Sequence, residues 1–390
     1  MRIALIYDRI YPQNIGGLER YYDALARGLV LSHSVTYLTQ APEDRAALAS
    51  APRPYRVITV APPSAYYSDK GNRRIWPALR FGIGIFGHFL RRGGSYDVIH
   101  CASFPFFSVF AARLAFLFRR RRPKLVVDWL EVWDRDYWIE YAGGLAGRIG
   151  YGIQQLCMQA PDHGLTYSVL HEARLGGHRQ PVLRLTGLAT DAPAPPTAPE
   201  PAAVKRSEAP TVIYAGRHIA EKQVALIPEV IERCRRANEA IRCTLIGDGP
   251  ERPAVAKAIE ERGLGSMVSL PGFVSDEELT EQLRDAACLL LPSLREGYGL
   301  IVIEAAAFGT PCVTIDAADN AAKELIVDGV NGFVVENWNA QGIADAVTRV
   351  VAAGGELRES TERWYRESWD ELSVESSVRR VDDLYRTLTA

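Results

Sequence analysis

The feature that most constrains the fold is an alternation of short apolar runs with stretches of helical spacing, which occurs in two series along the chain. In the first series, residues 3–7 precede 18–30, residues 97–101 precede 106–118, and another apolar run covers 125–129. Short runs of this kind, followed by amphipathic segments, are typical of parallel strands that helices connect and cover on both faces. The alternation therefore predicts an α/β fold with doubly wound sheets.

A proline-rich stretch separates the two series. It includes the run Asp-Ala-Pro-Ala-Pro-Pro-Thr-Ala-Pro-Glu-Pro, which holds too many prolines for a helix or a central strand. Apolar runs resume after it, at 211–215, 243–246, 268–270, 289–291 and 311–315. We predict an N-terminal Rossmann-like domain over 1–188, a linker over 189–209, a second Rossmann-like domain over 210–367 and a C-terminal helix over 368–390 that crosses back to the first domain.

Composition excludes several classes of protein. The 45 basic and 47 acidic residues give a net charge of -2, so no overall field attracts nucleic acid, and we expect no such partner. The 6 cysteines are scattered without a Cys-x-x-Cys pair, which favours a reducing compartment and argues against structural zinc. No apolar run reaches the ~18 residues of a membrane span, and the first residues form a strand rather than a signal peptide. The sequence predicts a cytoplasmic protein.

The segment that carries most chemical information follows the apolar run 289–291. Gly297 and Gly299 allow a sharp turn and a close approach of the backbone to a ligand. The helical pattern then begins, so the N–H groups of Leu300 and Ile301 lack partners within the helix. Such groups bind phosphate, and the carboxyl end of a parallel sheet is where open α/β folds bind ligands. The segment predicts a phosphate-binding loop.

Two carboxylates accompany this loop, Glu296 before the helix and Glu304 within it, where they suit sugar and ribose hydroxyls. Their separation by seven residues, the order Glu-Gly-aromatic-Gly with Tyr298 as the aromatic, and the later Gly309 and Pro311 resemble the retaining glycosyltransferases of family four. These are the group 1 glycosyltransferases that include glycogen synthase-like and mannosyltransferase-like enzymes. The alternative is a helix start with ordinary surface acids.

The resemblance implies the GT-B fold, in which two facing Rossmann-like domains enclose an interdomain cleft. It also implies roles for the two glutamates: Glu296 stands near the donor sugar as a catalytic residue, and Glu304 holds the ribose. Gly297, Tyr298, Gly299, Leu300 and Ile301 would line the donor site between them.

A pair of cations follows the first strand of the second series. Arg217 and Lys222 could grip a diphosphate and stabilise the charge that develops on it as a glycosidic bond breaks. The family uses a Gly-Arg and a nearby Lys for this task, so the resemblance makes both residues catalytic candidates. Seen alone, such residues are usually solvated surface.

Weaker matches surround the same site. Gly16 and Gly17 join the first strand to the first helix, where the family has a glycine-rich loop beside the donor phosphates, although a plain tight turn is the alternative. They do not form a dinucleotide-binding Gly-x-Gly-x-x-Gly pattern. Val274 follows a strand and resembles a family position whose backbone contacts the base.

The sequence departs from the family after the run 125–129. Many members have a histidine near the reacting centre, and Leu130 stands in its place here. Glu131, Trp133 and Tyr137 are candidates for contact with the acceptor, with core packing as the alternative for the aromatics. The sequence Asp134-Arg135-Asp136 formally matches a metal-binding Asp-x-Asp motif of another glycosyltransferase fold, but we interpret it as accidental and predict no metal.

Clustered arginines lie beside apolar residues at 73–77, 86–92 and 113–124. Such a face could rest on anionic lipid, so the sequence leaves open a peripheral contact with the inner face of a membrane. The commoner role of such arginines is to stabilise helix ends and to keep the surface soluble.

Together these features predict a retaining, metal-independent glycosyltransferase that needs no cofactor. It would move a sugar from a UDP- or GDP-sugar to a hydroxyl of a glycolipid, a polysaccharide or a secondary metabolite. The alternatives are a nucleotide-sugar epimerase, a sugar-phosphate synthase on the same fold, and a catalytically silent nucleotide-sugar binding subunit.

Overall fold

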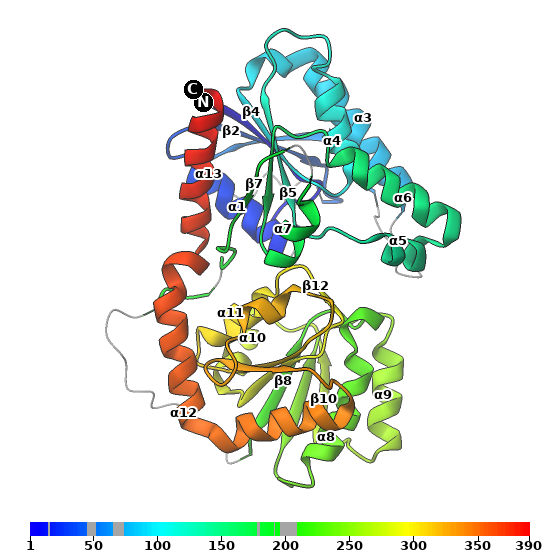
Figure 1. Cartoon of the computed structure of the whole chain (residues 1–390), viewed down its shortest axis with the longest axis vertical. Helices are drawn as coiled ribbons and strands as arrows, with labels where there is room; N and C mark the ends of the chain where they lie inside the picture. Colours follow the sequence, from blue (N-terminus) through cyan, green and yellow to red (C-terminus); the bar gives the residue numbers. More distant parts are fainter. Residues whose placement is uncertain (15, 45–51, 65–73, 178–179, 191, 196–208) are drawn as a thin grey trace. The chain divides into compact units, whose positions relative to one another are not determined.

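A computed structural model describes residues 1–14, 16–44, 52–64, 74–177, 180–190, 192–195 and 209–390 (Figure 1). The chain divides into two compact units. Unit 1 consists of Met1–Thr190 together with Ser373–Ala390, and unit 2 consists of Asp191–Leu372. The predicted linker 189–209 falls largely outside the described residues.

Unit 1 is built on a seven-stranded parallel sheet with the order β3-β2-β1-β4-β5-β6-β7. Its strands are β1 (Arg2–Ile6), β2 (Ser34–Gln40), β3 (Arg56–Ala61), β4 (Val98–Ala102), β5 (Lys124–Trp129), β6 (His163–Thr166) and β7 (Val182–Arg184). The helices are α1 (Gly17–Leu29), α3 (Ile75–Arg92), α4 (Phe106–Leu114), α5 (Arg135–Ala142), α6 (Gly144–Cys157), α7 (Val169–Leu175) and α13 (Val374–Thr389).

The central strands of unit 1 are buried along almost their whole length, as a sheet covered on both faces requires. Leu5 of β1 lies opposite Tyr37 of β2 on one side and His100 of β4 on the other, and all three side chains are fully buried. Helix α1 is amphipathic and places Tyr21, Tyr22, Leu25 and Leu29 against the sheet.

Helix α13 belongs to unit 1 although it comes last in the described chain. It packs alongside α1 (Figure 1), where Gly28 leaves room for Val378 because a Cβ at Gly28 would lie 2.6 Å from Val378 Cγ1. His33 Nε2 lies 2.5 Å from the carboxylate of Asp382. Residues 368–390 thus divide between the end of α12 and all of α13 and do not form one helix.

Unit 2 contains a six-stranded parallel sheet with the order β10-β9-β8-β11-β13-β15 and a two-stranded pair, β12-β14. The strands are β8 (Thr211–Ala215), β9 (Arg242–Ile246), β10 (Val268–Gly272), β11 (Cys288–Leu291), β12 (Arg295–Glu296), β13 (Cys312–Ile315), β14 (Asp319–Asn320) and β15 (Gly332–Val335). The helices are α8 (Ile227–Cys234), α9 (Arg252–Glu261), α10 (Asp276–Asp285), α11 (Leu300–Ala306) and α12 (Ala340–Leu372). Short 3-10 helices are η1 (Gly93–Ser95) in unit 1 and η2 (Ala220–Lys222), η3 (Val224–Leu226) and η4 (Ala321–Leu325) in unit 2.

Both sheets change direction of winding at one point. In unit 1 this point lies between β1 and β4, and in unit 2 it lies between β8 and β11. Doubly wound sheets bind ligands beyond the carboxyl ends of the strands at such points. The two parallel, doubly wound sheets confirm the predicted fold class.

The six cysteines are all buried and form no disulfide. Burial raises the pKa of the Cys101 and Cys288 thiols far above the ordinary value. Among the described residues, no helix has both the length and the apolar content that a membrane crossing requires.

Candidate active site

The loop after β11 is held by a small strand pair. Glu296 of β12 lies opposite Asn320 of β14, and the side chains of Arg295 and Asp319 pair beside them. The Asn320 amide donates to Thr314 Oγ1 at 2.9 Å and to the Ile315 carbonyl at 2.9 Å, which anchors the pair to β13. Glu296 is therefore positioned just beyond the carboxyl end of β11 by main-chain pairing.

Gly299 makes the turn into α11 feasible. Its φ of 99° lies in the left-handed region, and a Cβ there would lie 2.5 Å from Ala322 Cβ. Ala322 belongs to η4, so the loop and this turn are packed in direct contact. A residue with a side chain at position 299 would both strain the backbone and push the two segments apart.

The structure brings two of the predicted catalytic residues together. Lys222 Nζ lies 2.5 Å from Glu296 Oε1, and the Lys222 and Glu296 side chains are only 20% and 14% exposed. Ser293 Oγ donates to the same carboxylate oxygen at 2.9 Å, and Lys222 Nζ also donates to the Arg295 carbonyl at 3.1 Å. The main-chain amide of Leu294 donates to the Glu221 carbonyl at 2.8 Å, which ties the two loops together.

These contacts bring the Lys222 ammonium, from the loop after β8, and the Glu296 carboxylate, from the loop after β11, to the point where the sheet of unit 2 changes winding. Arg217 lies in the same loop as Lys222 and is exposed, two residues beyond β8. The hydroxyl of buried Tyr214 donates to the Arg217 carbonyl at 2.9 Å and so fixes the main chain there. Burial, and then the charge of Glu296, raise the pKa of Tyr214 far above its ordinary value.

The remaining donor-site candidates also lie at this end of the sheet. Leu300 and Ile301 are the first two residues of α11, and Glu304 is half-buried in its second turn. Tyr298 is buried, and burial raises the pKa of its hydroxyl well above the ordinary value. Helix α11 has only 7 residues, so its dipole is small and the charges nearby must carry most of any attraction for phosphate.

Val274 follows β10 in a turn that begins at Gly272, whose φ is 90°. The main-chain amide of Gly247 donates to the Gly272 carbonyl at 2.8 Å, so the loops after β9 and β10 are joined. Val274 is half-buried, whereas its neighbour Phe273 is 78% exposed. These loops lie at the same sheet edge as Glu296, on the outer side of β8.

In unit 1, Gly16 and Gly17 mark the start of α1 directly after the loop from β1. Gly16 has extended backbone, and a Cβ there would run into the carboxylate of Glu19. Glu19 is buried and lies 3.6 Å from Arg9 Nη1. Glycine at position 16 is thus explained by the close approach of Glu19.

The aromatic candidates for the acceptor pack on one another. The Trp133 ring lies 4.8 Å from that of Tyr137 and 4.9 Å from that of Trp138, centroid to centroid. Trp133 Nε1 donates to Glu131 Oε2 at 2.7 Å. Both Trp133 and Tyr137 remain half-exposed at the rim of this cluster, which leaves a role in acceptor contact as a prediction.

Asp134, the first residue of the Asp-x-Asp match, caps helix α5. Its Oδ1 accepts from the Tyr137 amide at 2.7 Å, and its other oxygen lies 3.5 Å from Arg174. These contacts give Asp134 a structural role. Among the residues that the structure describes, no group of three or more His, Cys, Asp or Glu side chains is arranged to hold a metal ion.

Sequence reasoning missed a buried polar network in unit 1. The fully buried Asp128 accepts from the hydroxyls of Tyr22 at 2.6 Å and Tyr167 at 2.9 Å, and lies 2.8 Å from His100 Nε2. Tyr385 of α13 completes the network at 2.5 Å from His100 Nδ1. An aspartate within the apolar run 125–129 was the signal that could have identified it. Leu130, the position at which the resemblance predicts a histidine, lies two residues further on.

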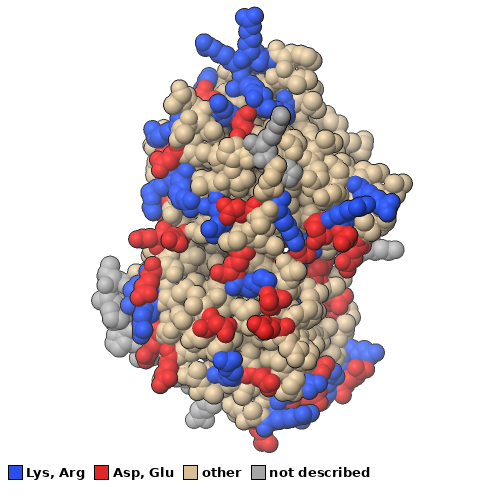
Figure 2. Space-filling view, viewed as in Figure 1, with Lys and Arg blue, Asp and Glu red and all other residues tan. Residues whose placement is uncertain are grey.

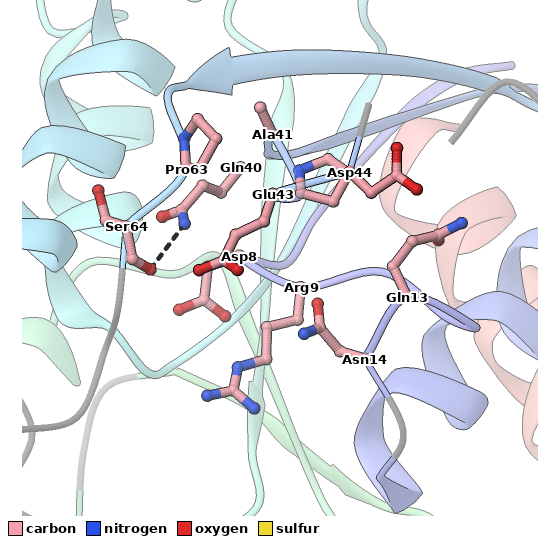
Figure 3. Close-up of a pocket in the computed structure, with 11 residues that line it drawn as sticks. Asp8, Arg9, Gln13, Asn14, Gln40, Ala41, Glu43, Asp44, Pro63 and Ser64 are labelled. Carbon is pink, nitrogen blue, oxygen red and sulfur yellow. Dashed lines mark hydrogen bonds between the residues drawn. The ribbon is translucent and has the colours of Figure 1, made fainter. Parts of the chain in front are cut away.

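Sequence reasoning also missed a cavity of about 470 Å³ in unit 1, which we call the unit 1 cavity (Figure 3). It lies beyond the carboxyl ends of β1, β2 and β3, and the loop before Gly16 contributes to its wall. Its lining residues are Asp8, Arg9, Gln13, Asn14, Gln40, Ala41, Pro42, Glu43, Asp44, Pro63 and Ser64.

Basic and apolar residues share one end of unit 1. Figure 2 shows Lys and Arg gathered at the end of the surface where, in Figure 1, the loops after α3 and α4 lie. Leu117 and Phe118, in the second of these loops, are 61% and 95% exposed. Arg119 and Arg122 make local contacts, with the Leu90 carbonyl and with Asp162 respectively. Peripheral contact with an anionic membrane stays a prediction; Arg73, part of the same pattern, lies outside the described residues.

Comparison with known proteins identifies relatives for both units. Residues 200–367 match the family described as "Glycosyl transferases group 1", and residues 16–179 match "Glycosyl transferase 4-like domain". An alpha-D-kanosaminyltransferase of Streptomyces kanamyceticus is 35% identical over 150 residues, which span 38% of this chain and 38% of that protein. The chain thus matches well under two thirds of the length of this curated relative.

Solved structures with the same fold cover nearly the whole chain. Sucrose-phosphate synthase of Thermosynechococcus elongatus has a TM-score of 0.75 at 18% identity, covering 99% of this chain and 98% of its own. Anabaena HepE, solved in complex with UDP-glucose, has a TM-score of 0.71 at 15% identity, covering 99% of this chain and 100% of its own. These likenesses show the GT-B fold, and the two family matches, over residues 16–179 and 200–367, show that the chain belongs to the group 1 glycosyltransferases.

Proposed function

We propose that this protein is a retaining glycosyltransferase that moves a sugar from a UDP- or GDP-sugar to a hydroxyl group of an acceptor. The observation that carries the proposal is the Lys222–Glu296 pair at 2.5 Å, held at the point where the sheet of unit 2 changes winding. Both family matches and the UDP-glucose complex of the structural neighbour HepE support a nucleotide-sugar donor.

The proposed mechanism needs a positive charge at the leaving group. As the bond between the anomeric carbon and the diphosphate breaks, Arg217 and Lys222 would stabilise the charge that develops on the phosphate oxygens. The acceptor oxygen would attack from the same face, and its proton would pass to the departing phosphate oxygen. Glu296 would orient the donor sugar and Glu304 would hold the ribose. Closure around the substrates would limit hydrolysis of the donor.

The contact between Lys222 and Glu296 gives this mechanism a specific feature. In the free protein Glu296 neutralises Lys222, so an arriving diphosphate competes with a carboxylate for the same ammonium group. Once the diphosphate has taken the ammonium, the Glu296 carboxylate keeps the Ser293 hydroxyl as a donor and can accept from a sugar hydroxyl. Donor binding and the orientation of the sugar would then be coupled through one side chain.

We further propose that no divalent metal is required, since Arg217 and Lys222 would supply positive charge at the diphosphate. The measurement is transfer activity after treatment with a chelator, compared with activity after addition of Mg²⁺ or Mn²⁺. Activity that disappears with the chelator and returns with the metal would overturn this part of the proposal.

Thermal unfolding with UDP, GDP, ADP and dTDP tests the donor site. A nucleotide at ~100 times its dissociation constant adds about 2.7 kcal/mol of stability, and one nucleotide should stand out. Arg217→Ala and Glu304→Gln should each reduce that stabilisation, whereas Glu140→Gln, on the exposed surface of α5, should leave it unchanged. If no nucleotide stabilises the protein, the donor site is wrong.

Turnover separates the proposal from its alternatives. Transfer to another molecule, with the anomeric configuration retained in the product, is expected, and Glu296→Ala should abolish it. A sugar that stays on the nucleotide with altered stereochemistry would indicate an epimerase, and transfer to a sugar phosphate would indicate a synthase. Nucleotide binding without turnover on any acceptor would indicate a binding subunit.

A further inference from the structure

The unit 1 cavity carries a feature that points to a ligand. Gln40, the last residue of β2, is 8% exposed, and its Nε2 donates to the Ser64 carbonyl at 3.0 Å. A carbonyl can only accept, so this bond fixes which end of the amide faces Ser64. The other end, Oε1, is buried and has no hydrogen-bond partner in the described part of the chain (Figure 3). A buried acceptor without a partner is unfavourable unless a donor arrives.

The charges around the cavity indicate what kind of donor would arrive. Among the described residues that line it, Asp8, Glu43 and Asp44 carry carboxylates and Arg9 carries a guanidinium. The Arg9 guanidinium also lies 3.6 Å from the carboxylate of Glu19, which neutralises part of its charge. The lining is therefore negative on balance, and a cation in the cavity would be stabilised.

The carboxylates differ in position. Asp8 is 3% exposed, whereas Glu43 and Asp44 are exposed at the rim. A ligand would therefore meet charge at the entrance and hydrogen-bond acceptors further in. One buried and two exposed acidic side chains suit a cation that also carries hydrogen-bond donors.

The size and position of the cavity complete the argument. A volume of about 470 Å³ falls within the range of ≈ 300–1,000 Å³ that is usual for small-molecule sites. The cavity lies beyond the carboxyl ends of three parallel strands, the edge at which such sheets bind ligands. The amides of Gln13 and Asn14 and the residue Ser64 add polar groups that suit a polyhydroxylated molecule.

We propose that the unit 1 cavity binds an acceptor that carries a protonated amino group, an amino sugar or an aminocyclitol. This inference rests on the proposed function only in treating the bound molecule as the acceptor. Gln40 Oε1 would accept from a hydroxyl or ammonium group of the ligand, and Glu43 would stabilise its positive charge. Neutral sugars of the same shape would lose the charge-assisted contact and bind more weakly.

Calorimetric titration of the full chain without nucleotide tests the binding claim. D-glucosamine is compared with D-glucose and N-acetyl-D-glucosamine, and 2-deoxystreptamine with myo-inositol, at a pH below the pKa of the amine. Each amine should bind about tenfold tighter than its neutral counterpart, the factor expected for one charge-assisted hydrogen bond. Equal affinities for amine and neutral compound, or no binding of any of them, would overturn the proposal.

Variants locate the site. Glu43→Gln, on the exposed rim, should weaken amine binding by about threefold to fivefold and leave neutral sugars unaffected, and Gln40→Met should weaken both kinds of ligand. Glu375→Gln, an exposed change in α13, is the control and should alter neither. Unchanged amine binding in Glu43→Gln would place the amine elsewhere and overturn the proposal.

A transfer assay distinguishes this inference from the proposed function. If amines bind with the predicted dependence on Glu43 but no sugar is transferred to them from any nucleotide sugar, the cavity stands as an amine site and the proposed function fails. If transfer occurs but prefers neutral acceptors in both wild type and Glu43→Gln, the proposed function stands and this inference is wrong.

Discussion

The Lys222–Glu296 pair allows a quantitative test of how the site is held together. At an effective dielectric constant of about 20, two unit charges at the observed 2.5 Å would attract by about 7 kcal/mol. Desolvation opposes most of that attraction, because both side chains are at most 20% exposed. The net coupling should fall between the value of about 0–1 kcal/mol for exposed pairs and the 3–5 kcal/mol lost when one partner of a buried pair is removed. We expect about 1–3 kcal/mol.

The perturbation is a double-mutant cycle with Lys222→Met, Glu296→Gln and both together. Single changes leave one group without its partner, whereas the double change removes both charges, so the double variant should be more stable than the sum of the single effects predicts. The exposed pair Lys257–Glu261, with side chains 73% and 59% exposed at 3.6 Å, provides a matched control in the same unit. Its coupling should be about 0.3–0.5 kcal/mol.

Hydrogen exchange is the suitable assay, because the unfolding of a chain with two units cannot be assumed to be two-state. The amides of β8 and β11 are buried at the centre of the sheet of unit 2, and their exchange reports the free energy of opening of that unit. A coupling below about 0.5 kcal/mol for Lys222 and Glu296, no larger than the error of additivity, would refute the inference that their contact organises the loop.

Three further predictions concern Gly299, His163 and Tyr385. Gly299→Ala should destabilise unit 2 by about 2–4 kcal/mol, because it strains a left-handed backbone and clashes with Ala322. The control Gly263→Ala, at a φ of 63° with open space around it, should cost only about 1 kcal/mol, and equal effects of the two changes in hydrogen exchange would contradict the packing argument. Burial lowers the pKa of the His163 imidazole below its ordinary value of 6.5, so the unfolded chain takes up this proton first, and stability should decrease as the pH falls through about 6.5. His163→Gln should reduce that decrease in thermal unfolding, and an unchanged pH dependence would exclude His163 as its source. Tyr385→Phe should lower the opening free energy of unit 1 by about 1–3 kcal/mol, because it leaves a buried imidazole nitrogen without its partner; exchange identical to wild type would show that the contact is not maintained in solution.

The sequence predicted the central strands of unit 2 well because they are short, wholly apolar and followed by clear turns. The predicted run 211–215 coincides with β8, and 289–291 falls within β11. Strand β2 of unit 1 was not singled out, since its buried positions include Thr36, Thr39 and Gln40, which hide its apolar character. Polar residues within a strand obscure the period on which such predictions depend.

Glu296, Arg217 and Lys222 were found from motif and spacing, but spacing could not show that Lys222 would pair with Glu296. That contact depends on the neighbouring positions of β8 and β11, which are far apart in the chain. The unit 1 cavity was missed for the same reason, because its lining comes from the ends of three strands, and no single segment shows its acidic balance. Sequence patterns predict local structure, and the residues that meet at a sheet edge are decided by strand order.

The position of α13 has a consequence for synthesis. Unit 2 is encoded as one continuous segment, whereas unit 1 is interrupted by it and needs residues 373–390. During translation, the ribosome makes all of unit 2 before it makes Tyr385, so the hydrogen-bond network of Asp128 and His100 stays incomplete until then. Domains generally fold as units while the chain grows. In this protein we expect the order to be reversed: the domain encoded second folds first, and the nascent first domain is the part most exposed to chaperones and proteases.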